Sequence, residues 1–350
     1  MSGLSWLRAL REPRQALAWD LAEWERIVRL SRRLRLLGRM AESIIDAGLI
    51  GEVPAQAARH LSAERRYARW RTAALVWVLE RLPAMIGDVD YPLVLLKGAA
   101  YIGQALPIAH GRLPSDADIL VPRAHLAHAH ERLMRAGWTE EDLDEHDRRF
   151  YREWSHEVPP MRHPLHGVEL DLHHNILPPV AHASVDAGLL LARLQPSIWP
   201  RWQVLHPTDQ VLHSAAHLFH DSEARDRLRD LVDLDGLLRC FGQAPEFWDD
   251  LIERAGRLGL TEPLALACHF TESWLQTPIP QAAQRRIQTV GPPRRHRVWL
   301  HALLSSVLTP TEPDASPSLG QDLAAQNGGK QAGDITITIF CGDQVGNPPA

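Results

Sequence analysis

Cysteine is scarce in this chain, whose 350 residues include only Cys240, Cys268 and Cys341. The three are far apart, odd in number and form no CxxC pair, so neither a disulfide framework nor a thiolate zinc site is indicated. An excess of basic charge is missing too, since the net charge is −5 with histidine counted as neutral. Because phosphate contacts dominate nucleic-acid affinity, this balance argues against a long nucleic acid as partner.

Long apolar runs are also missing. Residues 1–15 carry charges where a signal peptide needs an apolar stretch, and no segment approaches the roughly 18 uncharged apolar residues that span a bilayer. A hydrophobic fraction of 45% and a charged fraction of 23% are ordinary for a globular protein. The length is sufficient for two domains with separate cores. We therefore expect a soluble cytoplasmic protein with reduced cysteines and no membrane partner.

The hydrophobic pattern predicts an α+β fold, with a small mixed sheet between helical regions. Apolar residues spaced by three and four predict helices over residues 19–49, 63–86, 99–106, 123–136, 186–194, 208–220, 223–241, 245–258, 262–274 and 295–308. Short apolar or alternating segments predict strands over residues 92–96, 116–121, 150–158 and 168–173. The last two strands are expected to form a hairpin with its turn at residues 163–167.

The order of these elements divides the chain into four regions. We expect an N-terminal helical segment at residues 1–90, an α/β core at 91–178 and a C-terminal helical domain at 179–308. Residues 309–350 are rich in Pro, Gly, Gln, Asn and Ser, which is typical of a disordered, low-complexity tail. Its one apolar patch, at residues 335–340, either adds an edge strand or belongs to the disordered tail.

Two aspartates begin the strand predicted at residues 116–121. Side chains alternate between the faces of a strand, so Asp116 and Asp118 point the same way and repel each other. Magnesium would relieve this repulsion, because it binds carboxylate oxygens together with substrate phosphates. Two such ions can hold a phosphoryl group from both sides. The alternative is a pair of solvent-exposed aspartates at the end of a strand.

The strand at residues 168–173 offers further acids with the same period of two. Glu169, Asp171 and His173 share one face, and we choose Asp171 as the third carboxylate, with Glu169 as the fallback. This acid would serve as a second metal ligand or as the base for an attacking hydroxyl. The alternative is an aspartate that only pairs with an Arg or His. His173 would contact the substrate or orient a carboxylate.

A strand followed by Lys97, Gly98 and a helix offers a place for phosphate. Gly98 would allow a phosphate to approach the backbone closely, and Lys97 would add a positive charge. Arg112 is a second candidate for triphosphate contact, although a surface arginine in a turn is an equal alternative. The GxxxxGK[ST] pattern of a P-loop is absent from the chain.

These pieces, in this order, resemble the DNA polymerase beta-like nucleotidyltransferase superfamily, and within it a bacterial branch described as uncharacterised nucleotidyltransferases. The resemblance runs from about residue 19 to about residue 308. Its most specific segments are VLLKGAAYI at residues 94–102, GRLPSDADILVP at 111–122 and VELDLHHNI at 168–176. Lys97 and Gly98 stand where the broad superfamily has Gly-Ser, Ser115 stands where Gly is common, and His174 stands where the narrower family often has Trp.

The resemblance implies a nucleotidyltransferase core in residues 91–178, and two bound Mg²⁺ ions, for which Mn²⁺ would substitute. A nucleoside monophosphate would move from a nucleoside triphosphate such as ATP to the hydroxyl or phosphate of an unidentified acceptor, with release of pyrophosphate. Asp116 and Asp118 would bind both metals, and Asp171 would bind metal and activate the acceptor. We expect the nucleotide to be bound by Lys97, Gly98, Arg112 and Ser115.

Two other classes of function stay open at this stage. A degenerate member of the family would bind a nucleotide or a partner protein without catalysis. A metal-dependent hydrolase would use histidines, since His213 and His217 are four residues apart on a predicted helix and could hold zinc. No Glu follows His213, so the HExxH motif is absent, and packing is the alternative role for this pair.

Overall fold

The computed structural model describes residues 4–142, 144–145, 149, 151, 154–179, 184–220 and 227–291. All of them belong to one unit of the chain, which spans Met1–Pro313. The helix predicted at residues 295–308 and the tail predicted at 309–350 lie outside the described residues. Within the described part, no helix combines the length and the apolar character that a membrane crossing requires.

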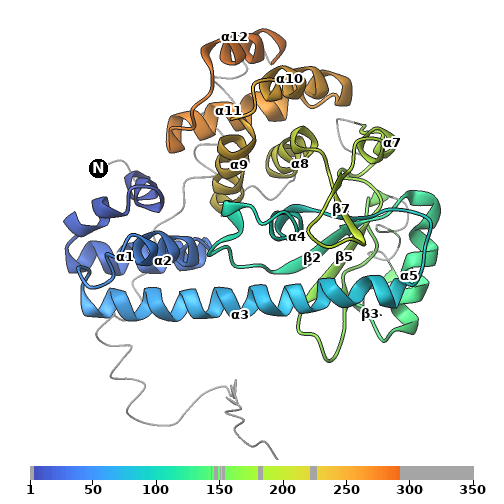
Figure 1. Cartoon of the computed structure of the whole chain (residues 1–350), viewed down its shortest axis with the longest axis horizontal. Helices are drawn as coiled ribbons and strands as arrows, with labels where there is room; N and C mark the ends of the chain where they lie inside the picture. The colour runs from blue at the N-terminus through green and yellow to red at the C-terminus, as the bar shows by residue number, and fades with distance from the viewer. Residues whose placement is uncertain are drawn as a thin grey trace, which may run out of the picture. The chain divides into compact units, whose positions relative to one another are not determined.

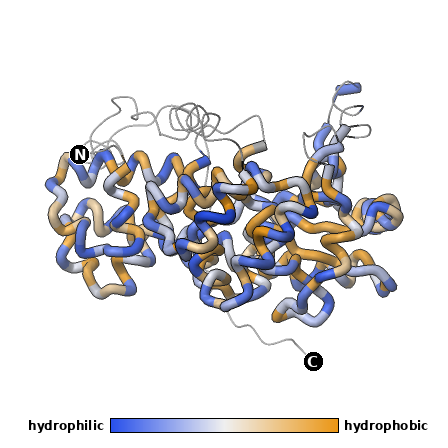
Figure 2. The backbone as a smooth tube through the Cα atoms, turned by 90° about the horizontal axis from the view of Figure 1, so that it is seen from above, coloured by the Kyte–Doolittle hydropathy of each residue, from blue (hydrophilic) through white to orange (hydrophobic). Residues whose placement is uncertain are grey.

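Helices and 3₁₀ turns precede the sheet. They are η1 Ser5–Leu10, η2 Pro13–Ala18, α1 Leu21–Arg33, α2 Leu37–Asp46 and α3 Ala55–Ile86. In this region the tube of Figure 2 changes repeatedly between hydrophilic and hydrophobic colours, as expected for helices with one buried face. The long helix α3 begins after Pro54, earlier than the predicted residue 63, and passes below the strands in Figure 1.

The helix predicted over residues 19–49 is in fact two helices, because the chain turns between α1 and α2. Arg35 has a φ of +55°, a left-handed conformation that interrupts the right-handed path of an α-helix. The turn lets α2 approach the loop before the second strand. A Cβ atom built on Gly38 would lie 2.4 Å from the carbonyl oxygen of Gly111, so glycine is required at this crossing.

A seven-stranded mixed sheet forms the centre of the fold, in the order β3-β4-β5-β2-β1-β7-β6. The strands are β1 Leu93–Leu95, β2 Asp116–Leu120, β3 Thr139–Glu140, β4 Met161–Arg162, β5 Glu169–His173, β6 Gln195–Pro196 and β7 Trp202–Val204. β2 pairs in parallel with β5 and antiparallel with β1, while β1 pairs in parallel with β7. This mixed sheet, flanked by helices, fits the predicted α+β class.

Two predictions about strands need correction. The described residues of the arm expected at residues 150–158 form no regular strand: Tyr151 and Trp154 are helical, and Glu157 makes a single bridge to His173. The strand that precedes the turn before β5 is β4. The sheet also continues beyond residue 178, where the core was expected to end. β7 lies beside β1, and β6 pairs with β7.

Short elements connect the strands. They are α4 Lys97–Ile102, η3 Pro107–Ala109, η4 Arg123–His125, α5 Leu126–Arg135 and α7 Ala187–Leu191. The predicted helices at residues 99–106 and 123–136 correspond to α4 and to η4 with α5. α4 and η3 matter most for the site, because they join β1 to β2 and carry Lys97 and the chain toward Asp116.

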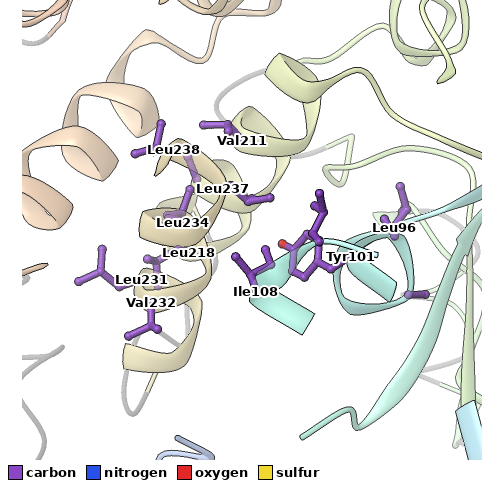
Figure 3. Close-up of a cluster of buried hydrophobic side chains, with 14 of the residues drawn as sticks. Leu96, Tyr101, Ile108, Val211, Leu218, Leu231, Val232, Leu234, Leu237 and Leu238 are labelled. Carbon is purple, nitrogen blue, oxygen red and sulfur yellow. The ribbon is translucent and has the colours of Figure 1, made fainter. Parts of the chain in front are cut away.

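Beyond β7 the described chain is helical up to residue 290. It contains α8 Pro207–His220, α9 Leu228–Phe241, α10 Phe247–Leu258, α11 Thr261–Leu275 and α12 Gln281–Val290, which lie above the strands in Figure 1. α8 and α9 pack on α4 and η3 through the buried side chains of Figure 3, among them Tyr101, Ile108 and Leu237. A Cβ atom on Gly236 would lie 2.2 Å from a methyl carbon of Ile108, so η3 approaches the backbone of α9 closely. This packing fixes the helical part against the loop that leads into β2.

Candidate active site

Three carboxylates meet where β2 and β5 begin their parallel pairing. The register places Asp118 directly beside Asp171, and Asp116 beside Glu169. Residues that are paired directly across two neighbouring strands point to the same face of the sheet, and so do residues two apart on one strand. Asp116, Asp118 and Asp171 therefore share a face. Carboxylate oxygens of these three aspartates lie within 4.8 Å of one another. The buried Ala117, on the opposite face of β2, belongs to the hydrophobic core that fixes this orientation.

The entrance to both strands is tied to α3 by one arginine. Arg71 donates hydrogen bonds to the carbonyl oxygens of Ser115 at 2.9 Å, Gly167 at 3.0 Å and Pro114 at 3.4 Å. The residues before β2 and before β5 are therefore held by a single guanidinium. The hydroxyl of Ser115 also donates to Oδ1 of Asp116 at 2.9 Å, which helps to orient that carboxylate.

Lys97 places a positive charge against the acids. Its Nζ donates to Oδ1 of Asp118 at 2.7 Å, and the Asp118 side chain is only 3% exposed. Lys97 has a φ of +42°, a left-handed conformation that costs about 1 kcal/mol or more for a residue with a side chain. Strain of this kind is found where a side chain must be aimed at a particular place. The sequence predicted Lys97 for phosphate and missed its contact with Asp118.

A histidine completes the surroundings of Asp118. Nε2 of His173 lies 3.2 Å from Oδ1 of Asp118, and Nδ1 of the same ring lies 2.9 Å from Oε2 of Glu157. His173 is 1% exposed, so the ring lies between two carboxylates with almost no contact with water. The expected role of His173 in orienting a carboxylate agrees with this geometry.

The ionisation of the acids differs although they lie together. Burial raises the pKa of Asp116, and the charge of Asp118 raises it further. The pKa of Asp171 rises to about 8, first through burial and then through Asp118 and Asp116. Burial acts the same way on Asp118, but Lys97 and His173 outweigh it and hold the pKa of Asp118 well below its usual range. Asp116 and Asp171 are thus short of neighbouring positive charge.

The two cationic groups stay charged. Burial would lower the pKa of Lys97, but Asp118 and Asp116 outweigh it and raise that pKa above its ordinary value. Burial would also lower the pKa of His173, but the contacts with Asp118 and Glu157 raise it to about 9. Both groups therefore carry a proton at neutral pH.

The donor set fits a hard divalent cation. Three carboxylates on one face supply only oxygen atoms, which is the ligand type that Mg²⁺ and Mn²⁺ prefer. The high pKa of Asp171 has burial and like charge as its causes, and a cation would remove the second of these. Asp116, Asp118 and Asp171 are the residues that would hold the ion.

Two predicted candidates lie elsewhere. Glu169, the fallback for the third acid, has its carboxylate bound by Arg162, with Oε2 at 2.8 Å from Nη2 and 2.9 Å from Nε. Arg112 is 7% exposed and donates from Nε to Oδ2 of Asp233 at 2.9 Å. A Cβ atom on Gly98 would lie 2.3 Å from Nη1 of Arg112, so the guanidinium packs directly against the start of α4.

The histidines of α8 do not join a metal cluster in the described part of the chain. The rings of His213 and His217 lie 6.3 Å apart at a near-perpendicular angle, and neither belongs to the two groups of metal-ligating side chains found among the described residues. Burial holds the pKa of both well below the usual value, so both rings are neutral in the fold. This geometry favours packing for the pair.

Sequence reasoning missed Glu157 and His156. Both lie in the segment that was expected to form a regular strand, and the pattern gave no reason to place either beside His173. Only the bridge between Glu157 and His173 brings them there. The sequence shows only a His-Glu pair and, later, a strand that carries a histidine. This pattern is too common to have indicated the contact.

One comparison with known proteins gives a match. A family model described as an uncharacterised nucleotidyltransferase matches residues 20–276, from the N-cap of α1 to the residue after α11. The matched range contains Lys97 and all three aspartates of the site. No curated protein matches the chain, and no solved structure matches it.

Proposed function

This chain belongs to the uncharacterised nucleotidyltransferase family, and we propose that it transfers a nucleoside monophosphate from a nucleoside triphosphate to the hydroxyl or phosphate of an acceptor. The observation that carries the proposal is the convergence of Asp116, Asp118 and Asp171 within 4.8 Å on adjacent strands, beside a half-buried Lys97. We also propose, as the sequence resemblance implies, that the core is of the DNA polymerase beta-like type.

The proposed reaction forms one bond and breaks one. An oxygen of the acceptor attacks the α-phosphorus, the bond from that phosphorus to the oxygen shared with the β-phosphate breaks, and pyrophosphate leaves with the electron pair. Bound Mg²⁺ ions would neutralise the phosphate charge and lower the pKa of the attacking hydroxyl. Asp171 takes the acceptor's proton in this proposal. The bound cations would keep Asp171 ionised, because they offset the like charge of Asp118 and Asp116 that raises its pKa in their absence, so its carboxylate would be free to accept that proton.

Lys97 would bind the phosphate chain without leaving Asp118. An ammonium group has three donors, and only one of them is used by the 2.7 Å contact with Oδ1 of Asp118. The remaining donors can bind oxygens of the β- and γ-phosphates and stabilise the pyrophosphate as it leaves. Gly98 and Ser115 would line the same side of the nucleotide. Arg112 would support the nucleotide-binding residues from beneath, because its guanidinium is hydrogen-bonded to Asp233 and packs against Gly98.

Label transfer tests the reaction. Each nucleoside triphosphate labelled at the α-phosphate is incubated with Mg²⁺, the protein and a cell extract, and we expect one of them to label an acceptor. Asp116→Asn and Asp118→Asn should abolish this transfer. Asp88→Asn is the matched control, since Asp88 is 99% exposed and pairs only with Arg201 at the surface in the described structure. Transfer that continues at the same rate in both site variants would refute the proposal.

Nucleotide binding can be tested without knowledge of the acceptor. The chain has only two lysines, Lys97 and Lys330, so an amine-reactive reagent has few targets. We expect a nucleoside triphosphate with Mg²⁺ to slow the modification of Lys97 at least tenfold while Lys330 reacts as before. Equal rates at Lys97 with and without nucleotide would contradict the placement of the phosphates.

A further inference from the structure

A second group of ligating side chains lies on the other side of His173. In the sheet, β2 lies on one side of β5, and the bridge from Glu157 reaches His173 from the opposite side. Two backbone hydrogen bonds hold this segment in place, from the amide of Val158 to the carbonyl of Leu172 and from the amide of His174 to the carbonyl of His156. His156 and Glu157 are therefore positioned by the backbone, on the side of β5 opposite to β2.

The three side chains are close enough to share an ion. One ligand atom from each of His156, Glu157 and His173 lies within 4.8 Å of the other two. Nδ1 of His173 is 2.9 Å from Oε2 of Glu157, and the two imidazole rings have centroids 5.3 Å apart. Ligands of one Zn²⁺ ion at ordinary bond lengths lie roughly 3.3 Å apart, so a contraction of about 1.5 Å at most is needed.

Two buried nitrogen atoms in this group lack a hydrogen bond in the described structure. They are Nδ1 of His156 and Nδ1 of His173, and the latter has Oε2 of Glu157 at 2.9 Å as its ion-pair partner. A buried polar atom without a hydrogen bond is destabilising. All three residues belong to one cluster, so a cation bound there would compensate the polar atoms buried within it.

The other nitrogen of His173 has the partner that a metal ligand needs. A histidine that binds a metal through one nitrogen nearly always donates the N–H of the other to a carboxylate or carbonyl, which fixes the tautomer. Nε2 of His173 faces Oδ1 of Asp118 at 3.2 Å, so a metal ion that displaces the proton of Nδ1 would meet a ring already oriented through Nε2. Two imidazole nitrogens and one carboxylate are a set that selects Zn²⁺, Fe²⁺ or Co²⁺ over Mg²⁺.

We propose that His156, Glu157 and His173 form a transition-metal site, most suited to Zn²⁺, that is separate from the site of the three aspartates. The ion completes its coordination with water. It fixes the ring of His173 and, through Nε2, the carboxylate of Asp118. The proposal does not depend on nucleotidyl transfer, since metal binding at this site is measured without any nucleotide or acceptor.

Metal content tests the site. Protein without a histidine tag is stripped with a chelator, mixed with one equivalent of Zn²⁺ in the presence of excess Mg²⁺, and passed through a desalting column before elemental analysis. We expect close to one zinc per chain to be retained. With Co²⁺ in place of Zn²⁺, absorption in the visible range from a low-symmetry nitrogen and oxygen site is expected.

Variants assign the ligands. His156→Gln and Glu157→Gln should each weaken zinc binding at least 100-fold in competition with a chromophoric chelator. Asp116→Asn and His217→Gln are controls that should retain zinc, because they remove a ligand of the aspartate site and a histidine of α8. Unfolding by urea shows whether each variant is folded, so a loss of zinc in a folded variant is informative.

Three outcomes would overturn the proposal. They are a folded wild-type protein that retains no zinc, zinc that is retained equally by the His156 and Glu157 variants, and zinc that is lost in Asp116→Asn. In the first case, a proton shared between His173 and Glu157 accounts for their 2.9 Å contact. The proposed transferase activity can survive any of these results, and the zinc site can survive the absence of transfer.

Discussion

Binding of a divalent cation to the three aspartates should depend steeply on pH. A metal binds the ionised carboxylate, so it competes with the proton on Asp171, whose pKa is raised to about 8. The apparent Kd is multiplied by one plus ten to the power of pKa minus pH. With a pKa of about 8 this factor is about 100 at pH 6, about 11 at pH 7 and about 2 at pH 8. Affinity should therefore rise about 50-fold from pH 6 to pH 8.

The neighbouring groups do not produce this slope. His173, with a pKa of about 9, and Lys97, with a raised pKa, stay largely protonated up to pH 8. Asp118 is ionised throughout because Lys97 and His173 hold its pKa well below the usual range. Only Asp116, whose pKa is also raised by burial and by Asp118, would add to the dependence on Asp171.

The assay is a titration with Mn²⁺ at pH 6, 7 and 8, with free Mn²⁺ measured by electron paramagnetic resonance. Asp171→Asn should weaken binding at pH 8 and reduce the slope to the part that Asp116 contributes. Glu169→Gln is the matched control on the same strand, because Arg162 already binds its carboxylate, and it should keep the wild-type slope. A wild-type Kd that changes less than threefold from pH 6 to pH 8 would refute the reasoning.

Three further predictions concern the fold. Arg254→Met should lower the free energy of unfolding in urea by about 3–5 kcal/mol, because it leaves the fully buried Asp209 without its partner; Asp209→Asn in the same chain should restore much of the loss. Gly38→Ala should lower the thermal midpoint by an amount equivalent to about 1–3 kcal/mol, since its Cβ would lie 2.4 Å from the backbone oxygen of Gly111; an unchanged midpoint would disprove this close crossing. Burial lowers the pKa of His217, so this ring binds its proton mainly in the unfolded state. Below about pH 6.5 it therefore destabilises the folded protein by about 1.4 kcal/mol for each pH unit. The free energy of unfolding of His217→Gln, relative to that of wild type, should accordingly increase from pH 6.5 to pH 5.

The acids of the site could be found from the sequence because alternation in a strand is a local property. Asp116 and Asp118 are two residues apart, so their common face follows from the pleat alone. The choice of Asp171 over Glu169 could not be made locally, since both residues have the same parity. It depends on the parallel register, which places Asp118 beside Asp171 and leaves Glu169 to Arg162. A shift of the register by two residues would reverse that choice.

The features that were missed depend on contacts between distant segments. β7 is three residues long and lies beside β1 only because residues from both strands are buried in one core. The break between α1 and α2 left the helical periodicity almost intact, because each half has its own apolar face and only three residues, one of them Arg35 with its positive φ, lie between the helices. Arg112 was expected near phosphate, but its partner Asp233 is 121 residues away and could not be identified from spacing.

Asp116, Asp118 and Asp171 have the same side chain, but the charges around them give them two different roles. Lys97 and His173 both approach Oδ1 of Asp118, so this carboxylate is ionised and fixed while Oδ2 takes neither contact. Asp116 and Asp171 receive less compensation, and their raised pKa values mean that the fold holds them at a free-energy cost. A cation placed among the three acids lowers that free-energy cost most at Asp116 and Asp171, whose neighbouring positive charges compensate them only in part. It also meets Asp118 in an orientation that Lys97 and His173 have already fixed. In the metal-free protein, Glu157 also acts on Asp118 through His173, because Asp118 and Glu157 together raise the pKa of that ring and keep it charged.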